Sequence, residues 1–352
     1  MTVNSSKYHA SCDNRLRWTQ FILLCLTLIV ALSIKSSAQG SCPAFTKVDG
    51  KTIPPISKND TIFKFSGGYV AIVHEMQVDT DGSPVAYHPE DLGTSLLCDG
   101  LDPYDTKAHK CDLNKKKGSA CFQAVKKASE AKWDASKSGP FCIYGFDTPG
   151  SSAPGSNKNV WGKGFGAGLI PTQDATDPAP GFFISSTSFD DPANHGKHMH
   201  YINADVVPYV VVPGSLVGKG KDFPGHPTAA WAWSTRTGFE SPAVIGDTQS
   251  HFGEGSVALV QALENNSIIP IKPAQVLGTS PDALTFPYVK KNGAVRATSG
   301  ATGTIVFLYF TKGAAVIDLS NEGIAAGVNK AFNGLGGHDS MKACLMDLVN
   351  KN

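Results

Sequence analysis

The feature that most constrains this sequence is a series of short apolar segments separated by turn-forming residues. These segments are rich in Val, Ile, Phe, Tyr and Trp, which favour β-strands. Glycine and proline are frequent, with 36 and 22 residues, and only 17% of the chain is charged, which disfavours a helical bundle. The sequence therefore predicts a mainly β protein with a few helices. The predicted strands are Thr61–Phe65, Tyr69–Val78, Phe182–Ser186, Val206–Val212, Ala229–Thr235, Pro242–Ile245 and Thr304–Phe310.

The N-terminal segment has the features of a signal peptide. Arg15 and Arg17 precede the apolar run Phe21–Ile34, which is shorter than the roughly 20 residues of a membrane span. Small residues up to Ala38 suit a signal peptidase, so we expect residues 1–38 to be removed and the protein to be secreted. An uncleaved single-span anchor is the alternative; after cleavage, no contact with a membrane is expected.

The remaining chain is expected to form one domain over residues 39–352, because no linker rich in Pro or Ser divides it. The order of its predicted strands resembles six-stranded barrels of the double-psi type. Besides a helix after Ser256, two helices are predicted: Ala120–Trp133, which follows Ser119, and a C-terminal helix over 340–350, where apolar residues recur at helical spacing.

Cysteine usage agrees with an oxidising compartment. Two of the eight cysteines, Cys12 and Cys25, lie in the predicted signal peptide, which leaves an even number. Three disulfides are consistent with this number, although 15 pairings are possible. The clustering of cysteines predicts a disulfide-stapled insertion near 98–142, and the absence of Cys-x-x-Cys disfavours zinc or redox sites. The remaining cysteines are Cys42, Cys98, Cys111, Cys121, Cys142 and Cys344.

Charge and glycine patterns exclude several classes of partner. The chain has 31 Lys and Arg against 30 Asp and Glu, so no basic excess is available for nucleic acid. The glycine-rich segment Gly162–Gly168 fits neither the dinucleotide-binding nor the P-loop spacing. We therefore expect no nucleic acid partner and no cofactor.

The segment Gly246–Leu259 contains two carboxylates, Asp247 and Glu254, in what the sequence predicts to be a connection between a strand and a helix. These residues are seven positions apart, at most roughly 23 Å in an extended chain. A turn would bring them to the roughly 6.5–9.5 Å that separates the acid and base of an inverting glycosidase. The structural alternative is that Asp247 starts a turn and Glu254 complements the positive end of the helix.

The residues around the two acids are predicted to determine the conformation of the connection between the strand and the helix. Ala243–Ile245 is predicted to be a buried strand, and Ser256 is predicted to cap the helix that follows. Gly246, Gly253 and Gly255 would allow positive φ and the close approach of another chain.

Three sequence blocks resemble one enzyme family. The pattern Ile245–Thr248 followed by Gly253–Leu259 resembles the active-site signature of the chitosanases of glycoside hydrolase family seventy-five. Glu75–Gly82 resembles the Met-x-x-Asp-x-Asp-Gly stretch of that family, and Asp205–Pro213 resembles the strand that lies between the two. The blocks occur in the family's order and extend over about residues 62–265.

The resemblance implies an endo-acting, inverting hydrolase of chitosan, the β-1,4-linked polymer of glucosamine. It also implies that Asp247 and Glu254 are the essential catalytic pair. Because Glu254 precedes a predicted helix, the helix dipole favours its ionised form and hence the role of base, which leaves Asp247 as the acid. An apolar pocket around Glu254 would reverse these roles.

Asp79 and Asp81 are the predicted ligands of the substrate. The family resemblance favours carboxylates that line the cleft and bind the ammonium groups of glucosamine units. The structural alternative is a tight turn at the end of a strand. Calcium is disfavoured, because an EF-hand register would require carboxylates at Gln77 and His88.

Four histidines and one tryptophan are further candidate site residues. His251 lies between the two acids and could tune a carboxylate, contact sugar or act only as a spacer. Trp233 could stack on a sugar ring, with packing in the core as the alternative. His195, His198 and His200 could form a metal site, but the sequence offers no evident carboxylate or Cys partner, so exposed loop histidines and no metal are expected.

Two other functions compete with a chitosanase. One is a metal-dependent hydrolase that uses the histidine cluster. The other is a non-catalytic carbohydrate-binding or wall-associated protein, although a binding protein has no need of a paired acid and base. We expect a monomer whose partner is chitosan or its partly acetylated oligosaccharides.

Overall fold

The computed structural model divides the chain by its internal contacts into Met1–Cys42 and Pro43–Asn352. The predicted signal peptide, residues 1–38, lies outside the described residues, and the description below concerns the second unit. The structure describes residues 42–51, 53, 59–89, 93–94, 101–105, 107, 110–111, 119–139, 141–143, 146, 177–195, 197, 199–269, 288–291, 294–297, 302–311 and 315–352.

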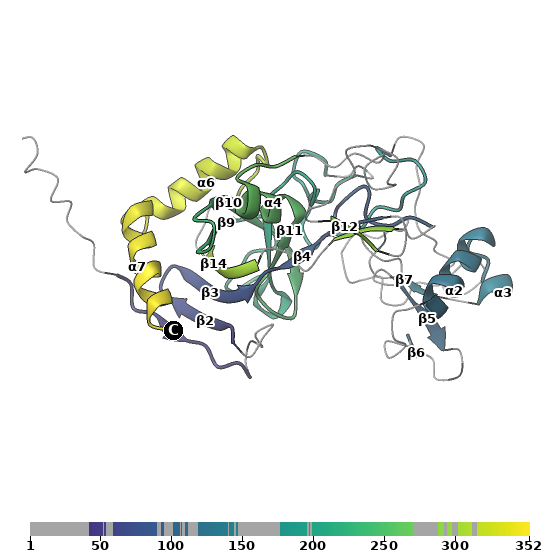
Figure 1. Cartoon of the computed structure of the whole chain (residues 1–352), viewed down its shortest axis with the longest axis horizontal. Coiled ribbons are helices and arrows are strands. Elements are labelled where there is room, and N and C mark those ends of the chain that lie inside the picture. The colour runs from purple at the N-terminus through teal and green to yellow at the C-terminus, as the bar shows by residue number, and fades with distance from the viewer. Residues whose placement is uncertain are drawn as a thin grey trace, which may run out of the picture. The chain divides into compact units, whose positions relative to one another are not determined.

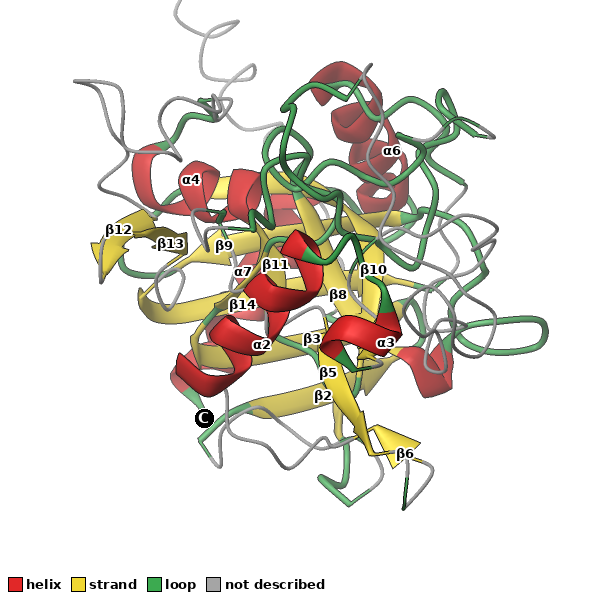
Figure 2. Cartoon of the chain, turned by 90° about the vertical axis from the view of Figure 1, so that its right-hand side faces the viewer, coloured by secondary structure: helices red, strands yellow, loops and turns green. Residues whose placement is uncertain are grey.

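A single curled sheet of nine strands forms the core of Pro43–Asn352 (Figure 2). Only Met76 separates β3 from β4 along the chain, yet β3 lies inside the sheet and β4 forms one of its edges. The sheet therefore curls strongly. The strand order is β1 (Thr46–Lys47), β2 (Thr61–Phe65), β3 (Gly68–Glu75), β14 (Thr302–Phe310), β9 (Ala229–Ser234), β10 (Glu240–Gln249), β8 (Tyr209–Pro213), β11 (Glu254–Ser256) and β4 (Gln77–Asp79).

The predicted class, mainly β with a few helices, is confirmed, but the predicted six-stranded barrel is wrong. The sheet is a half-barrel of nine strands. Two of these strands, β1 and β11, have only two and three residues, too few to show an apolar pattern. The segment predicted as a strand at Phe182–Ser186 forms only isolated bridges, from Phe183 to Tyr87 and from Ser185 to Phe146.

The central strands are apolar on both faces because both faces are covered. Every residue of β8 and β9 is buried. On one side, α6 (Asn321–Asn333) packs Phe332 against Trp231 of β9 and Phe310 of β14, with ring centroids 5.7 and 5.3 Å apart. The chain then enters α7 (His338–Asn350), which corresponds to the helix predicted at 340–350 (Figure 1).

The remaining elements are short. The helix predicted at Ala120–Trp133 is present as α2 (Ser119–Glu130). The other helices are η2 (Gly214–Leu216), α3 (Ala135–Ser138) and α4 (Val257–Asn265). The other strands form a three-stranded sheet of β5 (Leu101–Asp105), β6 (Lys110–Cys111) and β7 (Phe141–Ile143), and a hairpin of β12 (Tyr288–Lys291) and β13 (Ala294–Ala297).

Two of the cysteines are placed by the structure. Cys42 and Cys344 are both disulfide-bonded. Cys98 lies outside the described residues, as do the side chains of the other three cysteines between 98 and 142. The disulfide-stapled insertion therefore stays a prediction.

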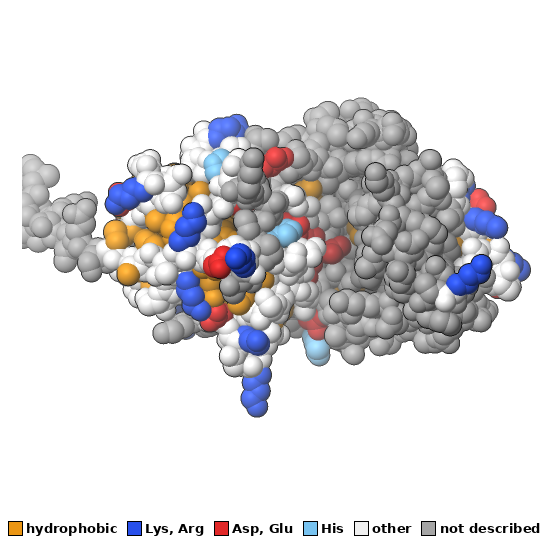
Figure 3. Space-filling model, turned by 90° about the horizontal axis from the view of Figure 1, so that it is seen from below, with side chains coloured by type: hydrophobic (Ala, Val, Ile, Leu, Met, Phe, Trp, Pro, Cys, Tyr) orange, Lys and Arg blue, Asp and Glu red, His pale blue; other side chains and the backbone are white. Residues whose placement is uncertain are grey.

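The described surface carries a mixed charge. Figure 3 shows Lys and Arg side chains interspersed with Asp and Glu, and neither sign dominates the face in view. Within the residues that the structure describes, no helix combines the length and the apolar character needed to cross a membrane.

Candidate active site

Asp247 lies inside strand β10, whereas the sequence predicted a position on a connection. The pairing of β10 with β8 shifts register between Ile245 and Asp247, so Gly246 forms a β-bulge. A Cβ atom at Gly246 would lie 2.6 Å from the Cβ atom of Tyr209, so only glycine fits. Because a bulge changes the face to which the following side chain points, Gly246 sets the direction of Asp247.

Glu254 is the first residue of β11 and therefore also lies in the sheet. This strand pairs in parallel with β4, with Glu254 opposite Gln77 and Ser256 opposite Asp79. Strand β11 also pairs with β8, which lies next to β10. The curl of the sheet thus brings together strands that carry Asp79, Asp247 and Glu254.

The glycines around Asp247 and Glu254 are needed for different structural reasons. Gly253 adopts a φ of 109°, a conformation that glycine tolerates best. Gly255 is needed for close packing, because a Cβ atom there would lie 2.8 Å from Leu259 Cδ2 and 3.0 Å from the carbonyl oxygen of Tyr209. Positive φ is therefore required at Gly253, and close approach at Gly246 and Gly255.

Ser256 joins α4 to the neighbouring strand. Its Oγ accepts a hydrogen bond from the backbone N–H of Leu259 at 3.1 Å, which confirms the predicted helix cap. The same oxygen accepts the backbone N–H of Tyr209 at 3.0 Å and donates to the carbonyl of Val207 at 2.8 Å. This fully buried serine fixes the helix next to the carboxylates.

The carboxyl group of Asp247 is held by a loop that the sequence did not indicate. Its Oδ1 accepts the backbone N–H of Ser188 at 2.7 Å and that of Thr248 at 2.6 Å. The hydroxyl groups of Ser188 and Thr248 are 2.6 Å apart. Ser188 precedes Asp247 by 59 residues and belongs to no recognisable motif, so the sequence offered no signal for it.

Three aspartates converge at the end of β4. Carboxylate oxygens of Asp79, Asp81 and Asp247 lie within 4.8 Å of one another. Asp79 accepts the backbone N–H of Asp81 at 2.9 Å. The side chains of Tyr209 and Asp247 lower the pKa of Asp79, against the larger effect of burial. Tyr209 donates to the carbonyl oxygen of Asp81 at 2.9 Å.

Burial makes ionisation of this cluster costly. Burial and the charge of Asp79 raise the pKa of Asp247 to about 8. Burial, with the charges of Asp79 and Asp247, raises the pKa of Glu254 to about 8 as well. Burial raises the pKa of Asp79 to about 6. In the described part of the chain, no Lys or Arg side chain pairs with any of these three residues.

His251 lies beside Glu254 but does not neutralise it. The Nε2 atom of His251 is 3.6 Å from Glu254 Oε1. Burial lowers the pKa of His251, so its ring is neutral at pH 7. The charge of Glu254 also contributes to the raised pKa of Tyr309, whose main cause is burial. Among the described residues, no positively charged group contributes to the shift in the pKa of Glu254.

Trp233 does not join this cluster. It is only 8% exposed, and the Nζ atom of Lys342 from α7 lies 5.3 Å from the centre of its ring. Its ring is therefore part of the packing between β9 and the C-terminal helix.

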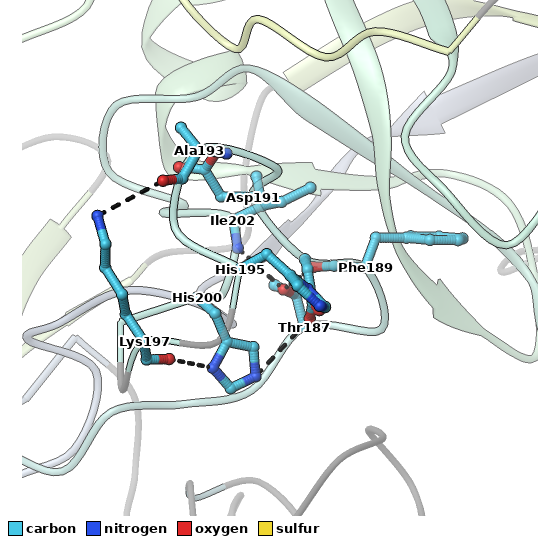
Figure 4. Close-up of polar contacts among 9 residues, drawn as sticks. Thr187, Phe189, Asp191, Ala193, His195, Lys197, His200 and Ile202 are labelled. Carbon is cyan, nitrogen blue, oxygen red and sulfur yellow. Dashed lines mark hydrogen bonds and ion pairs between the residues drawn. The ribbon is translucent and has the colours of Figure 1, made fainter.

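The histidine loop has a carboxylate partner that the sequence analysis missed. His195 Nδ1 lies 2.9 Å from Asp190 Oδ2, and His200 Nε2 lies 3.7 Å from Asp190 Oδ1. His200 Nδ1 also contacts the carbonyl oxygen of Lys197 at 2.7 Å (Figure 4). His198 lies outside the described residues. The side chain of His195 is 78% exposed, as expected for a loop histidine.

Only one group of side chains among the described residues has the spacing to hold a metal ion, and it consists of Asp79, Asp81 and Asp247. The oxygens of Asp79 and Asp247 lie within 4.8 Å of each other, and two ionised carboxylates this close repel each other strongly in a buried site, so one of the two holds a proton. A cation would have to displace this proton. Acidic clusters are common without an ion, so the arrangement is better suited to proton transfer.

The geometry can therefore support acid–base chemistry by carboxyl groups. Asp79, Asp81, Asp247, Glu254 and His251 are brought together, whereas Trp233 and the described histidines 195 and 200 make their contacts elsewhere. A comparison of the chain with models of known families and with characterised proteins finds no match, so the family resemblance stays a prediction that rests on its motifs.

Proposed function

We propose that this protein is a secreted, inverting hydrolase of chitosan that uses Asp247 and Glu254 as its catalytic pair. The observation that carries the proposal is the burial of both carboxyl groups beside Asp79, with no Lys or Arg partner among the described residues. Structural carboxylates buried in a protein are normally paired with a cation. An unpaired group of raised pKa is typical of a catalytic site.

We assign Glu254 as the general acid, which reverses the roles expected from the sequence. In the described structure its carboxyl group receives no hydrogen bond from a backbone N–H, and burial is the largest cause of its raised pKa of about 8, so Glu254 is protonated at neutral pH. The pKa of Asp247 is raised to about 8 as well, but the N–H groups of Ser188 and Thr248 make its ionised form less costly than that of Glu254. We therefore assign Asp247 as the base.

The reaction then follows a single displacement. Asp247 removes a proton from a water molecule as the water oxygen bonds to the anomeric carbon. The bond from that carbon to the glycosidic oxygen breaks, and Glu254 donates its proton to the departing oxygen. Glu254 regains a proton from solvent and Asp247 releases one, which restores the enzyme.

A local acidic site also suits a polycationic substrate. The net charge of the chain is only +1, so chitosan cannot be attracted by the protein as a whole. Asp81 lies beside the catalytic pair and is the ligand that we propose for an ammonium group of glucosamine.

Incubation with chitosan, chitin and cellulose tests the proposal. We expect chitosan alone to be shortened rapidly into oligomers of intermediate size, as endo-cleavage requires. Proton NMR of the first products should show the α-anomer, because an inverting enzyme changes the configuration of a β-linkage. Products with the β-anomer, or equal cleavage of cellulose, would contradict the assignment.

Metal removal distinguishes the proposal from a metal-dependent hydrolase. We expect a chelator such as EDTA to leave the rate of chitosan hydrolysis unchanged within about twofold, because acid–base catalysis by carboxyl groups needs no ion. A loss of activity that Zn²⁺ or Ca²⁺ restores would favour a metal mechanism. Tight binding of chitosan without any cleavage would favour the carbohydrate-binding alternative.

A further inference from the structure

The contact between Asp79 and Asp247 suggests a role for Asp79 other than binding an ammonium group. Their carboxylate oxygens lie within 4.8 Å of each other, and burial raises the pKa of both groups. Two ionised carboxylates at this distance repel each other strongly in a buried site, so one of the two holds a proton. Two carboxyl groups in this arrangement titrate as a unit.

The surrounding contacts keep the two groups in this arrangement. Both N–H donors to Asp247 reach its Oδ1, which leaves Oδ2 without a backbone donor among the described residues. Asp79 accepts the N–H of Asp81, and Tyr209 donates to the carbonyl oxygen of the same Asp81. Tyr209 is itself completely buried, so packing holds its ring in place.

We propose that Asp79 is a positioning residue that shares one proton with Asp247 and keeps it ready to act as the base. The inference rests on the proposed function for its catalytic meaning, but the shared proton is a property of the free protein. The pKa of Asp247 is the higher of the two, so Asp247 holds the shared proton at rest and passes it to Asp79 as it accepts another from water. The pair then carries one negative charge before the reaction and none after it.

Other groups face this pair and define its electrostatic surroundings. Asp81 follows Asp79 on the same turn, Glu254 comes from β11, and Tyr209 comes from β8. The Nε2 atom of His251 lies 3.6 Å from Glu254 Oε1, and burial lowers the pKa of this histidine. A single shared proton lowers the repulsion in a site that holds four carboxyl groups.

Carboxyl-carbon NMR of protein labelled with γ-¹³C aspartate tests the shared proton directly. We expect the resonances of Asp79 and Asp247 each to titrate in two steps with the same two midpoints. In Asp247→Asn, the resonance of Asp79 should change in one step. In Asp79→Asn, Asp247 should titrate in one step at lower pH than its second step in the unmodified protein, because the charge that raises its pKa is gone.

The matched control is Asp205→Asn. Asp205 is 2% exposed, and burial raises its pKa to about 7, but its partner is Ser83 and it lies outside the carboxyl cluster. This substitution should leave both titrations unchanged. Independent single-step titrations of Asp79 and Asp247 in the unmodified protein would overturn the inference.

Kinetics separate a positioning residue from a ligand of the substrate. For Asp79→Asn acting on soluble glucosamine oligomers, we expect kcat to fall at least about tenfold and KM to change less than twofold. A rise in KM with unchanged kcat would overturn the inference and return Asp79 to ammonium binding. Two-step titration in a protein that hydrolyses no polysaccharide would support the shared proton while rejecting the proposed function.

Discussion

Replacement of Glu254 by Gln will reduce the hydrolysis of soluble glucosamine oligomers by at least about 10³-fold. Gln preserves the size of the side chain but cannot donate a carboxyl proton to the departing oxygen. The Asp247→Asn variant should lose activity to a similar extent, because an amide cannot accept the proton of the attacking water. Initial rates measured by the release of reducing ends will check both variants.

The fold should survive both substitutions. Each removes a buried carboxyl group whose pKa is raised to about 8, so neither group stabilises the protein when ionised. Circular dichroism spectra and thermal midpoints should therefore match those of the unmodified protein. Asp205→Asn provides the control, because it removes an equally buried carboxyl group and should retain full activity. Most of the activity surviving in Glu254→Gln would reject its role as the acid.

The pH dependence of the unmodified enzyme follows from the same groups. The acid must be protonated, and the pKa of Glu254 is raised to about 8, so the rate should fall above that pH. The base must be ionised, and the lower pKa of the Asp79 and Asp247 pair is about 6, so the rate should also fall below pH 6. The profile is expected to be bell-shaped with its maximum between these values.

The residue types of the site were more predictable than its geometry. Asp247 and Glu254 could be singled out because glycines flank them and because a helix cap follows. The sequence could not show that both lie in strands, since a bulge at Gly246 interrupts the alternation on which strand patterns depend. Nor could it show Ser188, which reaches Asp247 through a backbone N–H that any residue except proline carries.

In the fold, too, features that depend on local sequence were predictable, and features that depend on pairing between distant segments were not. Apolar segments such as Ala229–Thr235 predicted strands correctly because their side chains are buried on both faces. The number of strands in the sheet depends on pairing between distant segments, as between β11 and β4, and local patterns do not encode it. Trp233 has an aromatic side chain suited to a sugar ring, but its contact with α7 arises only in the folded chain.

Replacement of Ser256 by Ala will have the largest effect on stability, with a loss of about 3–7 kcal/mol in the free energy of unfolding. Loss of the helix cap accounts for about 1 kcal/mol of this value. The remainder arises because the N–H of Tyr209 and the carbonyl of Val207 lose their buried hydrogen bonds to the serine, at about 1–3 kcal/mol each. Urea unfolding followed by tryptophan fluorescence measures the change.

Ser320→Ala is the matched control, because Ser320 caps α6 through the N–H of Gly323 at 3.1 Å but is exposed to solvent. This variant should lose only about 1 kcal/mol, the usual contribution of a cap. Since Ser256 also holds Tyr209, which contacts Asp79, its loss should reduce activity at urea concentrations where the protein is still folded. Equal destabilisation by the two substitutions would show that Ser256 acts as a helix cap and does not connect α4 to the carboxyl cluster.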